Sequence, residues 1–97
     1  MQKFTAEFKA IKDTLDKCWG ERGSKKDTLN RLIEARKKTF ANIYLGKVSP
    51  SKKKIINSEI RQLEEDVSDL DITIKELEHR YMLLKKQGLH IQEVKEA

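Results

Sequence analysis

The chain of 97 residues is poor in the residues that break or cross-link a polypeptide. It holds one proline, four glycines and one cysteine, and only 6% of its residues are aromatic. This scarcity excludes collagen and argues against a β-sandwich, which needs turn residues about every 8–12 positions. A lone cysteine excludes an intrachain disulfide framework. No apolar run approaches the roughly 18 residues that a membrane-spanning helix requires.

The first residues of the chain are charged and do not form the apolar stretch of a secretory leader. Together with the single cysteine, this predicts a cytoplasmic protein with no membrane partner. A chain of this length has room for one domain with a thin core. We therefore expect residues 1–97 to form a single domain.

Charge is unevenly distributed along the chain, whose formal net charge is +5. Residues 1–46 carry 11 basic and 6 acidic side chains, and residues 47–58 carry 4 basic and no acidic ones. Residues 59–79 carry 2 basic and 8 acidic side chains, and residues 80–97 carry 4 and 2. A basic first half can therefore neutralise an acidic stretch within the same molecule.

Apolar side chains recur at steps of three and four residues, the period of a helix with one buried face. The first helix is expected over residues 5–19 and the second over residues 25–45. Between them, Gly20 and Gly23 predict a break, because glycine is common just after a helix end.

A third helix follows a compact stop-and-restart signal. Gly46 ends the second helix, Ser49 is suited to cap the next, and Pro50 fits its first position. No breaker interrupts the chain until a glycine follows residue 87, so the third helix is predicted over residues 50–87. Residues 88–97 are expected to form a weakly structured tail.

The third helix carries a regular heptad repeat, with mostly β-branched residues at position a and mostly leucines at position d. Its length, roughly 57 Å, is typical of a coiled coil. The predicted seam residues are Ile56, Ile60, Leu63, Val67, Leu70, Ile74, Leu77, Tyr81 and Leu84.

Two arrangements compete to cover this seam. A parallel homodimer would set like charges against each other, with Glu59 facing Glu64 and Asp66 facing Asp71. An antiparallel pairing of the second and third helices instead places Arg31 opposite Glu64. We therefore predict an all-α fold: an antiparallel helical hairpin or a three-helix bundle built on one long C-terminal coiled-coil helix, forming a homodimer.

The first helix can be placed in two ways. It can continue the line of the second helix along the third, with the two glycines as a hinge, so that Leu15 meets Tyr81 and Ile11 meets Leu84. Alternatively, it folds back as the third member of a bundle. Both placements bury its apolar stripe.

Few side chains suggest catalysis or metal binding. Cys18 lies on the apolar stripe, which predicts a buried residue rather than a reactive thiol. His79 and His90 lack the clustered ligands of a structural zinc site. The carboxylates of residues 59–78 are expected to form solvated salt bridges. We expect no enzymatic activity, cofactor, metal or small-molecule substrate.

Two surface features are candidates for function. Ile72, Met82 and Leu83 fall outside the seam and form a candidate face for a partner protein or a second copy. The other feature is a group of basic residues around the turn, which could contact phosphates. This group comprises Arg36, Lys37, Lys38, Lys47, Lys52, Lys53 and Lys54.

These features lead to two hypotheses. In the first, a small non-enzymatic helical protein binds and modulates a larger protein partner as an adaptor, inhibitor or regulator. In the second, the lysine-rich hairpin tip binds nucleic acid without regard to sequence. The two hypotheses coincide if the protein partner is itself part of a nucleic-acid-processing machine.

Overall fold

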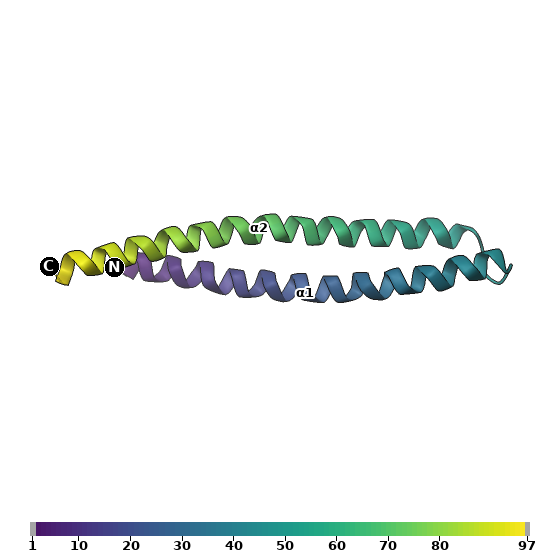
Figure 1. The fold of residues 1–97 in the computed structure, drawn as a ribbon, viewed down its shortest axis with the longest axis horizontal. Coiled ribbons are helices and arrows are strands. Elements are labelled where there is room, and N and C mark those ends of the chain that lie inside the picture. The colour runs from purple at the N-terminus through teal and green to yellow at the C-terminus, as the bar shows by residue number, and fades with distance from the viewer. Residues whose placement is uncertain (1, 97) are drawn as a thin grey trace.

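The computed structural model shows two long antiparallel α-helices joined by a short turn (Figure 1). α1 spans Gln2–Tyr44 and α2 spans Ser51–Glu96. The structure describes the backbone of residues 2–96 and the side chains of residues 6–87. The molecule measures 77 × 17 × 14 Å. It is therefore a rod, with both termini at one end and the turn at the other.

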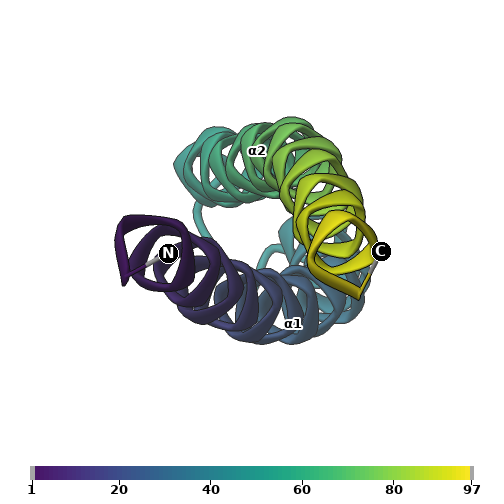
Figure 2. The same cartoon turned by 90° about the vertical axis from the view of Figure 1, so that its left-hand side faces the viewer.

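The all-α class and the helical hairpin are confirmed, and the two helices wind around each other along the rod (Figure 2). The three-helix bundle is wrong, because one helix replaces the first two predicted helices. α1 runs through Gly20 and Gly23 without a break. Neither helix has, within the described residues, the length and apolar character needed to cross a membrane.

The predicted break between residues 19 and 25 has a physical explanation in the seam of α1. The seam continues in steps of three and four from Cys18 through Arg22 and Lys25 to Leu29. Cys18 and Leu29 are buried, whereas the two basic residues between them are half-buried. Two charged side chains at seam positions interrupt the apolar stripe in the sequence, but they leave the helix and its register intact.

The two glycines of α1 occupy open positions on the helix surface. A Cβ atom added at Gly20 or at Gly23 would meet no other atom within 4 Å. Glycine in a helix interior costs about 0.5–1 kcal/mol relative to alanine. Packing along the seam offsets this cost, because tertiary contacts supply most of the stability of a helix in a protein.

Replacing Gly20 and Gly23 together with alanine is therefore expected to raise the free energy of unfolding by about 1–2 kcal/mol. Urea denaturation followed by circular dichroism measures this change. Gly46→Ala is the matched control and should lower stability, since Gly46 has a φ of +74° that alanine rarely adopts. A less stable double variant would contradict a continuous helix with solvent-facing glycines.

The end of α1 is a Schellman motif, in which the amides of two residues beyond the helix donate hydrogen bonds to carbonyl groups in its last turn. The Lys47 amide donates to the Asn42 carbonyl at 2.8 Å, and the Gly46 amide donates to the Ile43 carbonyl at 3.0 Å. The positive φ of Gly46 permits this geometry. The turn is therefore fixed by backbone hydrogen bonds immediately after the last residue of α1.

The start of α2 uses a serine cap. Ser49 Oγ accepts a hydrogen bond from the Ser51 amide at 3.4 Å, and the Ser49 carbonyl accepts one from the Lys52 amide at 3.0 Å. Pro50, which has no amide hydrogen, follows the cap at a position where none is needed. The cap and the Schellman motif together reverse the chain within six residues, 45–50.

The core of the rod is a single seam. Ile60, Val67 and Ile74 of α2 are buried, and they pack on the seam of α1 that holds Cys18 and Leu29. The other six predicted seam residues of α2 are half-buried. They are Ile56, Leu63, Leu70, Leu77, Tyr81 and Leu84. Burial thus follows the heptad period, with position a the more deeply covered.

The far end of α2 differs from the sequence expectation. The helix does not end at residue 87 but continues through Gly88 to Glu96. One glycine lowers the stability of a helix without ending it. The side chains of the predicted tail, residues 88–97, lie outside the described residues, as does that of His90.

Candidate anion-binding site at the hairpin tip

Two ion pairs cross the middle of the rod. Arg22 Nε donates to Asp71 Oδ1, and Lys25 Nζ donates to Asp66 Oδ2 at 3.1 Å. The hydrogen bond from Gln62, together with the hydrogen bond and charge of Lys25, lowers the pKa of Asp66 below its ordinary value. These two ion pairs join the helices along the seam, because Arg22 and Lys25 on α1 each meet an aspartate on α2.

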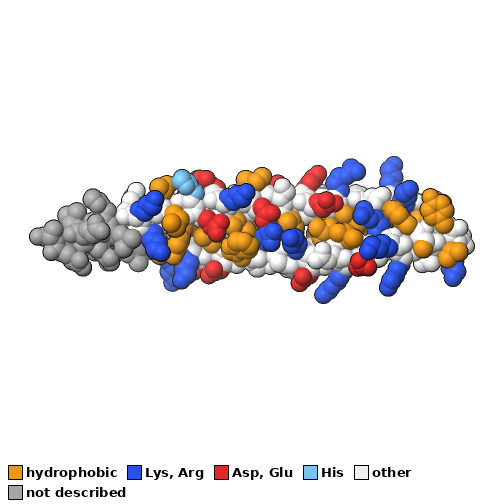
Figure 3. Space-filling view, in the orientation of Figure 1, with side chains coloured by type: hydrophobic (Ala, Val, Ile, Leu, Met, Phe, Trp, Pro, Cys, Tyr) orange, Lys and Arg blue, Asp and Glu red, His pale blue; other side chains and the backbone are white. Residues whose placement is uncertain are grey.

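The charge that remains is concentrated at the turn. Residues 35–58 carry seven basic side chains and no acidic one. The rest of the chain carries 14 basic and 16 acidic side chains, a net charge of −2. Figure 3 shows blue and orange side chains gathered at the turn, while red ones lie mainly over the middle of the rod. We call residues 35–58 the basic tip.

Four lysines of the basic tip are free to meet a ligand. Lys38, Lys47, Lys52 and Lys54 are exposed, and none forms an ion pair with any of the described residues 6–87. They come from the end of α1, the turn and the first turn of α2. The hairpin therefore brings cations from separate segments to one end of the molecule.

Two further lysines of the basic tip have partners within the protein. Lys53 Nζ lies 5.3 Å from the centre of the Phe40 ring, which attracts its charge. Lys37 Nζ lies 3.0 Å from Glu34 Oε1, and both side chains are exposed. Exposed pairs of this kind contribute about 0–1 kcal/mol, so Lys37 can exchange its carboxylate for a phosphate at little cost.

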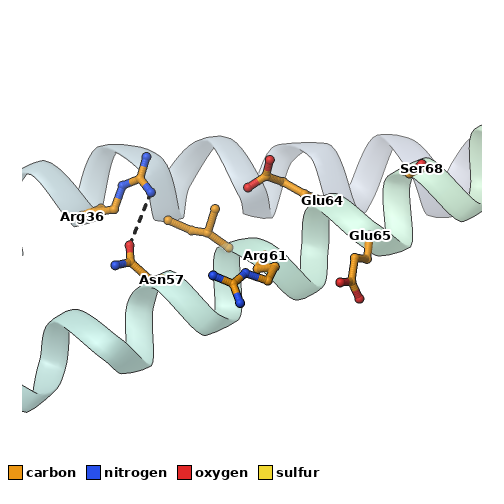
Figure 4. A pocket seen from close by; sticks show the side chains of 7 residues that line it. Arg36, Asn57, Arg61, Glu64, Glu65 and Ser68 are labelled. Carbon is orange, nitrogen blue, oxygen red and sulfur yellow. Dashed lines mark hydrogen bonds between the residues drawn. The ribbon is translucent and has the colours of Figure 1, made fainter.

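Arg36 has a different environment from the lysines. It is half-buried between the helices, where Nη1 donates to Asn57 Oδ1 at 3.4 Å (Figure 4). The open groove around this contact is also lined by Arg61, Glu64 and Glu65, so it carries both signs of charge. Arg36 therefore belongs to the interface between the helices rather than to the free cations of the tip.

The basic tip also exposes apolar side chains that the sequence analysis missed. Tyr44 is 89% exposed, Leu45 is 67% exposed and Ile55 is about half exposed. Tyr44 and Ile55 each belong to an apolar pair in the sequence, beside Ile43 and Ile56, and only one member of each pair can face the seam. Leu45 follows the last residue of α1. The register of the heptads identifies Ile55 as the outward member of its pair.

The predicted partner face is exposed but interrupted. Ile72 is 66% exposed, and Met82 and Leu83 are about half exposed. Heptad positions place Ile72 and Met82 on the outer face of α2, whereas Leu83 also lines a groove with Glu7 and Ile11 of α1. Glu76 and His79, both exposed, occupy the same outer face between Ile72 and Met82. The three apolar residues therefore form two separate patches.

Trp19 is a further large apolar side chain on the surface of α1. It is half exposed, and its ring lies 5.7 Å from Arg22 Cζ, the guanidinium that pairs with Asp71. Trp19 adjoins Cys18 in the sequence, and the seam of α1 passes through Cys18, so that Trp19 flanks the seam.

Comparison of the chain with protein-family models, curated proteins and solved structures finds no match. Within the described side chains, no three His, Cys, Asp or Glu residues cluster closely enough to hold a metal ion. Cys18 is buried, and His79 lies on the solvent-facing side of α2.

Proposed function

We propose that this protein is a non-enzymatic nucleic-acid-binding protein. Its basic tip binds the phosphate backbone without regard to base sequence. The observation that carries this proposal is the charge of residues 35–58, which hold seven cations and no carboxylate. Positive charge placed against phosphates releases condensed counterions and provides most of the affinity of non-specific binding. Four exposed lysines, which form no ion pair with residues 6–87, are available for such contacts.

The dimensions of the rod support contact with the backbone rather than with base edges. Its cross-section of 17 × 14 Å exceeds the width of the major groove of B-DNA, about 12 Å. Two paired helices entering end-on therefore meet the phosphates that border the groove. Because the remainder of the chain has a net charge of −2, we expect the tip rather than the side of the rod to approach the polyanion.

A titration of generic duplex DNA at several salt concentrations tests this proposal. We expect micromolar binding at low salt and a linear fall of log Kobs with log salt. Four to five lysine–phosphate contacts predict a slope of about −4, since each contact contributes about −0.9. Binding with a slope near zero, or no binding at low salt, would contradict the proposal.

A second candidate function is the binding and modulation of a larger protein. It is favoured by large apolar side chains that remain exposed on the half of the rod away from the turn, namely Trp19, Ile72, Met82 and Leu83. The first predicted helix cannot cover these side chains, because it is part of α1. They would be covered by a second copy of this chain, as in the predicted homodimer, or by a protein partner. If nucleic acid fails to bind at low salt, the binding of a larger protein becomes the favoured function.

A further inference from the structure

The most exposed aromatic side chain described in the structure lies inside the most positive region of the rod. Tyr44 is the last residue of α1 and is 89% exposed. Lys47 and Lys52, which have no ion pair among the described residues, belong to the turn and to the helix that follows it. An exposed aromatic ring within a region of basic side chains is the combination with which proteins hold single-stranded nucleic acid.

The backbone around Tyr44 is fixed by the turn. The Schellman hydrogen bonds of Gly46 and Lys47 close α1 within three residues of the tyrosine. The ring therefore stands on the end of a helix rather than on a free loop. A side chain presented in this way has only two rotatable bonds to order on binding, which keeps the entropic cost of a contact low.

We propose that Tyr44 is a stacking platform for an unpaired base, so that the basic tip prefers single-stranded nucleic acid to duplex. This inference rests on the proposed function, because the lysines hold the strand whose base meets the ring. In a duplex the bases stack on one another within the helix, and the tyrosine gains no ring to cover it. In a single strand every base has an open face, so the preference does not depend on sequence.

An anionic membrane is the other surface that attracts lysines and exposed apolar side chains. The arrangement of the turn argues against it. Lys47 lies between Leu45 and Ile55 along the chain, within the turn, so insertion of the apolar residues to the depth of the acyl chains would carry its ammonium group toward hydrocarbon. A charged side chain at the centre of a bilayer costs about 2.5 kcal/mol or more. Stacking of a base on Tyr44 does not require Lys47 to leave water, because its ammonium group can face the adjoining phosphate.

The experiment compares the full chain with Tyr44→Ala, Tyr44→Phe and Leu45→Ala. Each protein is titrated, at one salt concentration, with labelled oligothymidylate of about 20 nucleotides and with a duplex of equal length. We expect Tyr44→Ala to weaken single-strand binding roughly 5- to 150-fold, the equivalent of 1–3 kcal/mol for one stacked base. Its duplex affinity and its salt slope should stay unchanged, since no charge is removed.

The two other variants separate stacking from a general apolar contact. Tyr44→Phe keeps the ring and should bind single strands as the parent does. Leu45→Ala removes a neighbouring side chain that is 67% exposed and should have no effect on either ligand. Vesicles containing phosphatidylserine, titrated in parallel, should not compete with the oligonucleotide.

The outcomes distinguish this inference from the proposed function on which it rests. If the parent protein binds both ligands and Tyr44→Ala binds them equally well, stacking is wrong while phosphate binding stands. If the parent binds neither ligand at low salt, both proposals are wrong. If Tyr44→Ala and Leu45→Ala both release the protein from anionic vesicles, the tip is a membrane contact and the nucleic-acid inference is overturned.

Discussion

Ile74→Ala is expected to lower the free energy of unfolding by about 2–5 kcal/mol, the usual range for truncating a buried isoleucine. Ile74 is only 3% exposed and lies in the middle of the seam. A hairpin with one seam has few other contacts to compensate for the cavity, and a chain of this size is stabilised by only about 5–15 kcal/mol in total. Urea denaturation monitored by circular dichroism gives the difference directly.

Ile72→Ala is the matched control, since the same truncation is made two residues away on the same helix. Ile72 is 66% exposed and should contribute less than about 0.5 kcal/mol. Equal losses from the two variants would show that the seam is not the main core. A large loss at Ile72 that depended on protein concentration would instead show that a second copy covers the outer face of α2.

The architecture was predictable where local chemistry and periodicity agreed. The signal from Gly46 to Pro50 specifies a tight reversal, and the structure provides both the positive φ and the serine cap that these residues imply. The charge of the flanking helices then favours the antiparallel hairpin over a parallel dimer. These inferences need only nearest-neighbour physics and the heptad period.

The continuity of α1 could not be read from the apolar pattern, because Arg22 and Lys25 occupy seam positions. Their charges are tolerated there only because Asp71 and Asp66 lie across the seam, which is a property of the tertiary pairing. Their aliphatic stems can cover the seam while the charged groups reach its edge. A pattern that counts only apolar residues therefore places a break where the structure has two ion pairs.

The candidate site was predictable in composition but not in detail. The lysines of residues 52–54 stand out in the sequence because no acidic residue is near them. Their availability depends on packing, however, as shown by Arg36, which is held by Asn57, and Lys53, which lies over Phe40. The exposure of Tyr44 depends on how the turn ends α1, and apolar periodicity alone does not indicate it.

Reversing the charge of the three consecutive lysines of the tip should reduce affinity for nucleic acid by roughly 60-fold or more at about 0.1 M salt. Lys52 and Lys54 are two of the four free lysines, and each lost phosphate contact removes about 0.9 from the salt slope. Two contacts correspond to roughly 60-fold at that salt concentration before any new repulsion is counted. The variant is Lys52→Glu, Lys53→Glu and Lys54→Glu in one chain. Fluorescence anisotropy with a labelled duplex measures the loss.

The helix itself should tolerate this change. α2 has no acidic residue in its first turn, so three glutamates there would complement the partial positive charge of the helix N-terminus. Circular dichroism should therefore show undiminished helix content. A collapse of the helical signal would mean that the lysines stabilise the hairpin, as Lys53 could through Phe40, and that lost binding reports unfolding.

A control with the same total charge separates the position of the lysines from their number. Lys9, Lys12 and Lys17 are exposed on α1, roughly 40 Å or more from the turn, and have no ion pair among the described residues. Changing these three to glutamate gives the same net charge, −1, as the tip variant. We expect this control to keep most of the affinity and the salt slope. Equal losses would show that the whole rod attracts the polyanion and that the tip is not a site.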